Sequence, residues 1–287
     1  MQATSIHPAP WAELRPTEGR GEAWRQAHRA ALVIGEVGML WGQTMADHRH
    51  LATTYLHGPR ALVGCRIRGE RDFHVGLRLA SPGFVVLDDK YAVLQTFDLV
   101  GRTIFEARKW LLERAEKLVG GPARNEAHLD ARLDAHPLME GAPFGRGCEE
   151  GFCEVDRAYS NADAVLRRIL GDIAPGTAVR CWPHHFDIAA LVELDSDGDE
   201  PMTIGLGMAP ADDRQDRAYL YASPWPHPRA GTVLPPLAHG TWLEDGAPLA
   251  VLPIYKVAEA GSGALQARMA EEFLRSAYEA CEQALEG

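Results

Sequence analysis

The segment CWPHHFDIAALVEL, from Cys181 to Leu194, places two adjacent histidines and an aspartate at the start of an apolar, strand-like stretch. With the two-residue repeat of a strand, Phe186 and the apolar residues after it share one face, whereas His185 and Asp187 fall on the other. Polar side chains that can bind a metal would then lie side by side on a rigid element. Such an arrangement is typical of a site, although it identifies no single reaction.

This spacing is compatible with a metal site. Two positions apart on a strand, side chains lie roughly 6.5 to 7 Å apart on one face, close enough to share one ion. His185 and Asp187 have this spacing, and so do His48 and His50 in the segment ADHRHL. With His184, these pairs could form a site for zinc, iron or manganese that keeps a position open for water and supports hydrolytic or oxygen chemistry. In the competing, structural interpretation these histidines hydrogen-bond backbone carbonyls or nearby acids.

The segment SPWPHP, residues 223–228, is a second candidate site. Prolines stiffen a loop and tryptophan offers a broad apolar face, so Trp225 and His227, with Trp242, could wall a pocket for a small organic molecule. The alternative is a rigid corner that packs its tryptophan on a sheet. The isolated His57 and His74 are expected to be structural histidines.

Several common kinds of site are absent from the sequence. It contains no G-x-S-x-G, Walker, G-x-G-x-x-G or H-E-x-x-H motif of the kind that marks nucleophile, nucleotide or zinc sites. The acidic run Asp195–Glu200 lacks the glutamate that a calcium loop needs at its twelfth position, where the chain has Leu206. The five cysteines include no C-x-x-C pair and are expected to be reduced thiols, Cys148 and Cys153 included.

The composition and charge of the chain limit the classes of partner that it can bind. The chain has 287 residues, of which 46% are hydrophobic, and its net charge of -11 gives no basic field for nucleic acid. It shows no secretory signal and no apolar run of the roughly 20 residues that span a bilayer, so we expect a cytoplasmic protein without membrane contact. The expected partner is a small-molecule ligand, and the oligomeric state is left open.

Periodicity predicts the elements of the first half. Residues 17–41 repeat apolar side chains at three and four and predict an amphipathic helix, weakened by Gly35 and Gly38. Short strand-like runs separated by turn signals follow and favour an antiparallel meander. These runs are 51–56, 61–67, 73–79, 84–87 and 91–99. A second amphipathic helix is predicted from Ile104 to Leu118, before Gly120.

The second half repeats this order after a connector at 121–152 that has little periodicity. Ser160 and Asp163 form a capping-box pattern and predict a short helix that starts there. A closing helix at 264–285 is expected to bury Leu265, Met269 and Phe273 against a sheet. Strands are predicted at 179–194, 202–208, 218–223 and 249–257.

These elements predict an α+β protein of mainly antiparallel strands in two similar halves, each closed by a long amphipathic helix packed on the sheet. We expect one globular body with a first half at 1–120, a connector at 121–150 and a second half at 151–287. Its predicted function is that of a metal-dependent enzyme or metal-binding protein acting on a small molecule. The alternative is a non-catalytic small-molecule-binding or interaction module with a pocket lined by Trp and Pro.

The second half also resembles an uncharacterised bacterial family of domains of unknown function. The resemblance rests on FDIAA at 186–190, GLGMAP at 205–210, AYLYASP at 218–224, LPIY at 252–255 and the closing helix. Members often carry Trp-Gly-Ser where this chain has Trp182-Pro183-His184-His185. The resemblance implies a fold and an extent for residues 150–287, and it brings no activity.

Overall fold

The computed structural model describes residues 10–15, 21–126, 133–145, 149–194, 201–229 and 231–286. The chain divides into two compact units. Unit 1 comprises residues 1–16, 157–179 and 188–287, and unit 2 comprises residues 17–156 and 180–187. The acidic run Asp195–Glu200 and Cys148 lie outside the described residues. The described cysteines Cys65, Cys153, Cys181 and Cys281 are free thiols.

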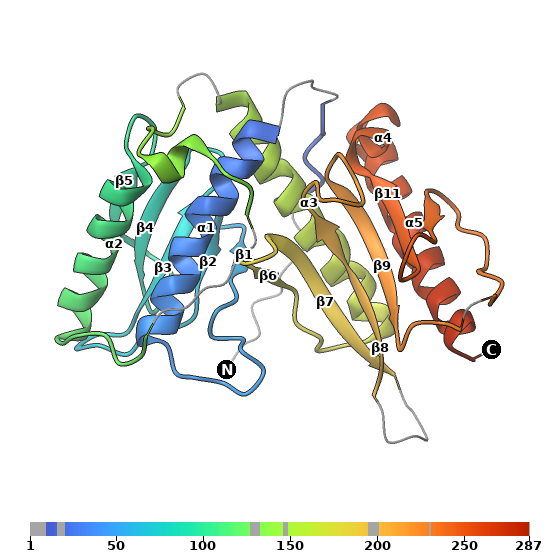
Figure 1. The fold of residues 1–287 in the computed structure, drawn as a ribbon, viewed down its shortest axis with the longest axis horizontal. Helices are drawn as coiled ribbons and strands as arrows, with labels where there is room; N and C mark the ends of the chain where they lie inside the picture. Colours follow the sequence, from blue (N-terminus) through green and yellow to red (C-terminus); the bar gives the residue numbers. More distant parts are fainter. Residues whose placement is uncertain are drawn as a thin grey trace. The chain divides into compact units, whose positions relative to one another are not determined.

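Unit 2 is built on a five-stranded antiparallel sheet with the order β1-β2-β3-β4-β5. This order is the meander that the sequence predicts, although several strands are shorter than expected. The strands are β1 (Thr54–Leu56), β2 (Ala61–Val63), β3 (Phe73–Arg78), β4 (Gly83–Asp88) and β5 (Val93–Asp98). The helices α1 (Gly21–Trp41) and α2 (Ile104–Val119) also belong to this unit, and α1 contacts both α2 and β3 (Figure 1).

Strand register divides the side chains of this sheet between two faces. Thr54 pairs with Val63, and His74 pairs with Leu87, so these residues share one face with the apolar cluster of Ala61, Val63, Val85 and Leu87. The opposite face lies toward α1, where Ile34 approaches Gly64. The strands β3 and β4 are almost wholly buried, which explains their near-continuous apolar sequence.

The ends of α2 follow local rules that the sequence displays. Thr103 and Glu106 form a reciprocal capping box, in which the Thr103 hydroxyl accepts from the Glu106 N–H and the Glu106 carboxylate accepts from the Thr103 N–H. Gly120 ends the helix in the left-handed region with a φ of 76°. The predicted boundaries of this helix are therefore confirmed to within a residue.

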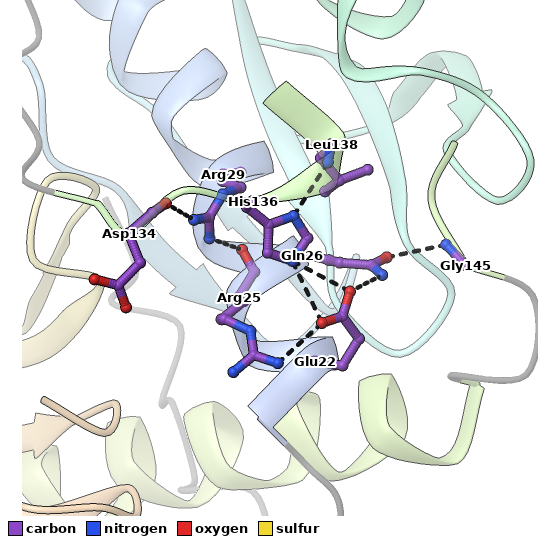
Figure 2. A network of polar contacts seen from close by, with 8 residues as sticks. All are labelled: Glu22, Arg25, Gln26, Arg29, Asp134, His136, Leu138 and Gly145. Atoms are coloured by element: carbon purple, nitrogen blue, oxygen red, sulfur yellow. Dashed lines mark hydrogen bonds and ion pairs between the residues drawn. The ribbon is translucent and has the colours of Figure 1, made fainter. Parts of the chain in front are cut away.

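The segment at 133–145 is fastened to the start of α1 by a polar network (Figure 2). His136 accepts the Leu138 N–H through Nδ1, so its Nε2 donates to the Glu22 carboxylate at 3.3 Å. Gln26 donates to the same carboxylate at 2.6 Å and accepts from the Gly145 N–H. Burial opposes ionisation of Glu22, but hydrogen bonds from Gln26, an arginine of α1 and His136 hold its pKa below the usual value.

The helix α3 (Glu149–Ile173) is much longer than the predicted short helix at 160–171. The prediction that Ser160 caps a helix N-terminus was wrong, because Ser160 and Asp163 are buried inside α3. Asp163 instead accepts a hydrogen bond from Arg167 one turn later, at 2.8 Å. A Ser-x-x-Asp pattern can thus occur in mid-helix as well as at a helix N-terminus. The connector is shorter than expected, and its described residues include a short 3-10 helix, η1 (Pro137–Glu140).

Unit 1 contains the antiparallel strand order β10-β11-β9-β8-β7 and the helices α4 and α5. The predicted strand at 249–257 ends at Pro253, where α4 begins, and β10 was not predicted. The elements are β7 (Asp187–Leu194), β8 (Met202–Ala209), β9 (Tyr219–Trp225), β10 (Thr241–Leu243), β11 (Leu249–Pro253), α4 (Ile254–Glu259) and α5 (Gly263–Glu286). The helix α5 packs against β8, β9 and β11 (Figure 1).

One face of α5 is buried, but it is rotated from the predicted one. Phe273 is fully buried as expected, whereas Leu265 is 53% exposed and Met269 is only half-buried. Gln266 occupies the buried position instead, and its amide bonds the backbone of Leu14, Ala258 and Gly261. A four-residue repeat drifts around a helix of 3.6 residues per turn, so its first members leave the buried face.

The described chain is therefore a mixed α+β protein with two antiparallel sheets, as the sequence predicts. No helix in the described ranges is long and apolar enough to cross a membrane.

Candidate functional site

Unit 2 contains a cavity of about 430 Å³, within the range typical of small-molecule sites. Its polar lining consists of Arg49, Arg66, Arg180, His50, His74 and Tyr91. Its apolar lining consists of Met45, Ala52, Leu56 and Val63, and the remaining wall residues are Gln43, Thr54, Gly64 and Cys65. All of these wall residues are described, and none is an aspartate or a glutamate.

Strand alternation explains why these side chains meet. Thr53 and Cys181 exchange two backbone hydrogen bonds of 2.8 Å, which join β6 (Arg180–Trp182) to the start of β1. Both residues are buried. Their chain neighbours Thr54 and Arg180 point to the other side and line the cavity, as do Ala52 and Leu56 at alternate positions. A bridge between residues far apart in sequence thus carries Arg180 to the cavity.

The two histidines of the cavity each have one ring nitrogen engaged by the backbone. His50 accepts the Met45 N–H through Nδ1 at 3.3 Å, so the neutral ring carries its proton on Nε2. His74 donates from Nδ1 to the Gly64 carbonyl at 3.0 Å, and its ring contacts Tyr91 at 4.8 Å between centroids. Burial and then the neighbouring His48 lower the pKa of His50, while Asp47 opposes the shift.

The three arginines of the cavity differ in their partners. Arg66 forms an ion pair with Asp72, and Arg49 lies 3.7 Å from the carboxylate of Asp47. Arg180 is half-buried, and in the described part of the chain it forms neither an ion pair nor a side-chain hydrogen bond. Among the described residues, the cavity therefore has one arginine whose charge no neighbouring carboxylate offsets.

Cys65 lines the cavity as a neutral thiol. Burial raises the pKa of Cys65 to about 11, so its sulfur is protonated at neutral pH and is a poor nucleophile. Gly38 of α1 and Gly42, just after the helix, lie close to this sulfur, and a side chain at Gly38 would also collide with the His50 carbonyl. The glycine that weakens α1 by propensity is thus required for the close approach of His50.

The five predicted metal ligands lie in unit 2, and the four histidines among them form two pairs. The His184 and His185 rings are 4.2 Å apart, and the His48 and His50 rings are 6.1 Å apart. Among the described residues no group of three or more His, Cys, Asp and Glu side chains gathers as a metal site requires. Of the predicted ligands, only His50 lines the cavity.

The expected strand spacing of His185 and Asp187 is not formed. The strand β7 begins at Asp187, and residues 183–186 form a turn in which the N–H groups of His185 and Phe186 donate to the Trp182 carbonyl. Phe186 has a φ of 54°, so the strand repeat does not extend back through it to His185. The alternation predicted for the rest of this strand is confirmed for Ile188, Ala190 and Val192, which are buried, whereas Leu194 at its end is only half-buried.

The predicted ligand-binding residues lie in unit 1. Trp225 is 51% exposed at the end of β9, and its ring contacts His227 at 4.9 Å between centroids. Trp242 lies on β10 and donates from its indole N–H to the Pro235 carbonyl at 2.8 Å. Trp225 and His227 are thus brought together, whereas Trp242 is held by a different loop.

Sequence reasoning missed most of the cavity lining. His74 was expected to be structural, and its Nδ1 is indeed satisfied by backbone, but the ring also forms part of the cavity wall. The three arginines carried no signal of their own, because arginines on strands and loops are usually solvated. Alternation in residues 52–56 could have shown which side chains share a face, but not that Arg180 lies opposite them.

Comparison of the chain with protein-family models, with curated proteins and with solved structures gave no match.

Proposed function

We propose that unit 2 binds a small organic anion in this cavity. One observation carries the proposal: three arginines and two histidines line a cavity of about 430 Å³, and no acidic side chain is found among the described residues of its wall. A site of one charge sign favours ligands of the opposite sign, because low-dielectric walls strengthen the attraction. The chain as a whole is acidic, with a net charge of -11, so the excess of arginine at this cavity is a local feature.

The apolar part of the wall supports a ligand that also has a hydrocarbon body. Met45, Leu56 and Val63 offer apolar surface beside the arginines, and Tyr91 adds an aromatic ring. Small-molecule sites commonly combine an apolar wall with a few polar groups that fix orientation. The neutral thiol of Cys65 argues against nucleophilic thiol catalysis, so binding is the function that this geometry supports best.

The proposal is tested by titrating the protein with benzoate and hexanoate, with benzamide as the neutral counterpart of benzoate. We expect the two anions to raise the melting temperature and benzamide to have little effect, because a ligand that binds only the folded state stabilises it. Thr54→Phe fills the cavity and should abolish the response to both anions. Arg268→Gln, which removes an exposed arginine of α5, is the matched control and should leave it intact.

Equal responses to benzoate and benzamide, or full anion responses in Thr54→Phe, would contradict anion binding in this cavity.

Other expectations from the sequence stand beside this proposal as hypotheses. They are a cytoplasmic location, no nucleic-acid partner, two similar halves, kinship with the bacterial family and a pocket at Trp225 and Trp242. A metal site at His184, His185, Asp187, His48 and His50 is a further hypothesis, tested by elemental analysis of wild type and His185→Ala.

A further inference from the structure

We infer that the cavity selects a monoanionic carboxylate with an apolar body, and that Arg180 is the residue that anchors the carboxylate. This inference rests on the proposed function and specifies the ligand class of the same site. The basis of this inference is that some of the charged side chains around the cavity already form ion pairs and one does not.

The fixed charges around the cavity leave a single excess positive charge. Arg66 is neutralised by Asp72, and Arg49 lies beside Asp47. Of the three arginines that line the cavity, only Arg180 has no carboxylate partner among the described residues. A site with one uncompensated arginine matches one negative charge, whereas a phosphate dianion would bring a second charge that the cavity does not balance.

The shape of the guanidinium also favours a carboxylate. Arginine presents a planar fork of N–H donors that pairs with both oxygens of a carboxylate at once. Arg180 is half-buried, while the side chains of Arg49 and Arg66 are 47% and 63% exposed. Because water screens an exposed charge more than a half-buried one, Arg180 should contribute most to binding.

His50 supplies a second donor of the right kind. Since its Nδ1 accepts the Met45 N–H, the ring is neutral there and its proton lies on Nε2. An N–H donor adds a hydrogen bond to a carboxylate oxygen without adding a charge. The apolar side chains of Leu56, Val63 and Met45 then remain for the rest of the ligand.

The test compares binding of benzoate, hexanoate and inorganic phosphate by calorimetric titration of the full-length protein. We expect wild type to bind both carboxylates more tightly than phosphate. Arg180→Gln should weaken carboxylate binding by about 10- to 100-fold, in the range of a charge-assisted hydrogen bond. Arg180→Lys should lie between the two, because it keeps the charge and loses the fork. Thermal melts of both variants check that they fold.

A matched pair of variants probes the paired arginine. Arg66→Gln should weaken carboxylate binding by less than about threefold, because Asp72 already offsets the charge of Arg66. Asp72→Asn releases Arg66 and should strengthen phosphate binding relative to benzoate, because the cavity then has a second uncompensated charge.

The outcomes separate the two proposals. Failure of every anion to bind wild type would overturn the proposed function. Anion binding that Thr54→Phe abolishes, but that Arg66→Gln weakens as much as Arg180→Gln does, would overturn the role of Arg180 alone. Tighter binding of phosphate than of carboxylates to wild type would overturn the ligand class.

Discussion

His28 is a half-buried side chain that packs against the turn that was expected to bind metal. Its ring stacks on Phe186 with centroids 5.1 Å apart and planes 10° from parallel, and Trp24 meets the same ring edge-on. Burial lowers the pKa of His28 to about 4, although the backbone of Pro183 and His184 opposes the shift. The aromatic support of Phe186 thus depends on a histidine that is neutral in the folded protein.

We predict a loss of stability on mild acidification that depends on His28. Between pH 6.5 and about 4 the unfolded chain takes up a proton at His28 and the folded chain does not, so the free energy of unfolding falls as pH falls. The difference in pKa corresponds to about 3 kcal/mol at most. Denaturant unfolding of wild type and His28→Gln across this range measures it.

The variant His28→Gln should show a flatter dependence of stability on pH in this window. His48→Gln, which replaces an exposed histidine, is the control and should keep the wild-type slope. Parallel pH profiles for wild type and His28→Gln would show that the proton uptake belongs to other groups.

At the scale of elements, the periodic pattern predicts that α5 is a helix, but packing decides which of its faces is buried. The pattern indicates a long amphipathic helix, and one forms at Gly263–Glu286. Its buried face runs through Gln266, Ala270 and Phe273 and leaves Leu265 exposed. A buried glutamine is not expected from hydrophobicity, but three backbone carbonyls satisfy its amide, so burying it is tolerated.

We predict that Phe273→Ala lowers the free energy of unfolding by about 3 to 5 kcal/mol, because it leaves a cavity in a fully buried site. Leu265→Ala is the matched control on the same helix and should cost well under 1 kcal/mol, because its side chain is 53% exposed. Urea unfolding of both variants measures the difference. Similar losses for the two variants would mean that the buried face of α5 is assigned wrongly.

At the scale of the whole molecule, each unit is assembled from segments distant in sequence. Tyr55 donates to the buried carboxylate of Asp156 at 2.8 Å, and both belong to unit 2. In unit 1, Asn161 exchanges two hydrogen bonds with the backbone of Ala12, at 2.8 and 2.7 Å. A cut between residues 145 and 146 would therefore take essential partners from both units.

We predict that fragments 1–145 and 146–287 do not fold when expressed separately, because each unit then lacks a segment that satisfies its buried polar groups. The first fragment would lack Asp156 and the bridge to Cys181, and the second would lack Ala12. Circular dichroism and amide dispersion in NMR spectra measure folding, with the co-expressed pair as the control. Two soluble fragments with separate cooperative melts would refute a single cooperative body.

The sequence by itself determined the class of fold and most of the elements, because these depend on interactions between near neighbours. Capping by Thr103 and Glu106, the glycine that ends α2 and the alternation of Ile188 onward are local features. The errors arose where local signals were ambiguous. The Ser160 pattern lies inside α3 and not at its N-terminus, and the strand that ends at Pro253 is followed directly by a helix.

Only the tertiary structure decided the composition of the candidate site. His50 was a candidate from its sequence spacing, but Arg180 reaches the same cavity through the backbone bridge between Thr53 and Cys181. Whether an arginine is paired likewise depends on its neighbours in space, as Arg66 and Asp72 show. Pairing of strand edges and compensation of charge act between residues far apart in sequence, so a periodic pattern does not encode them.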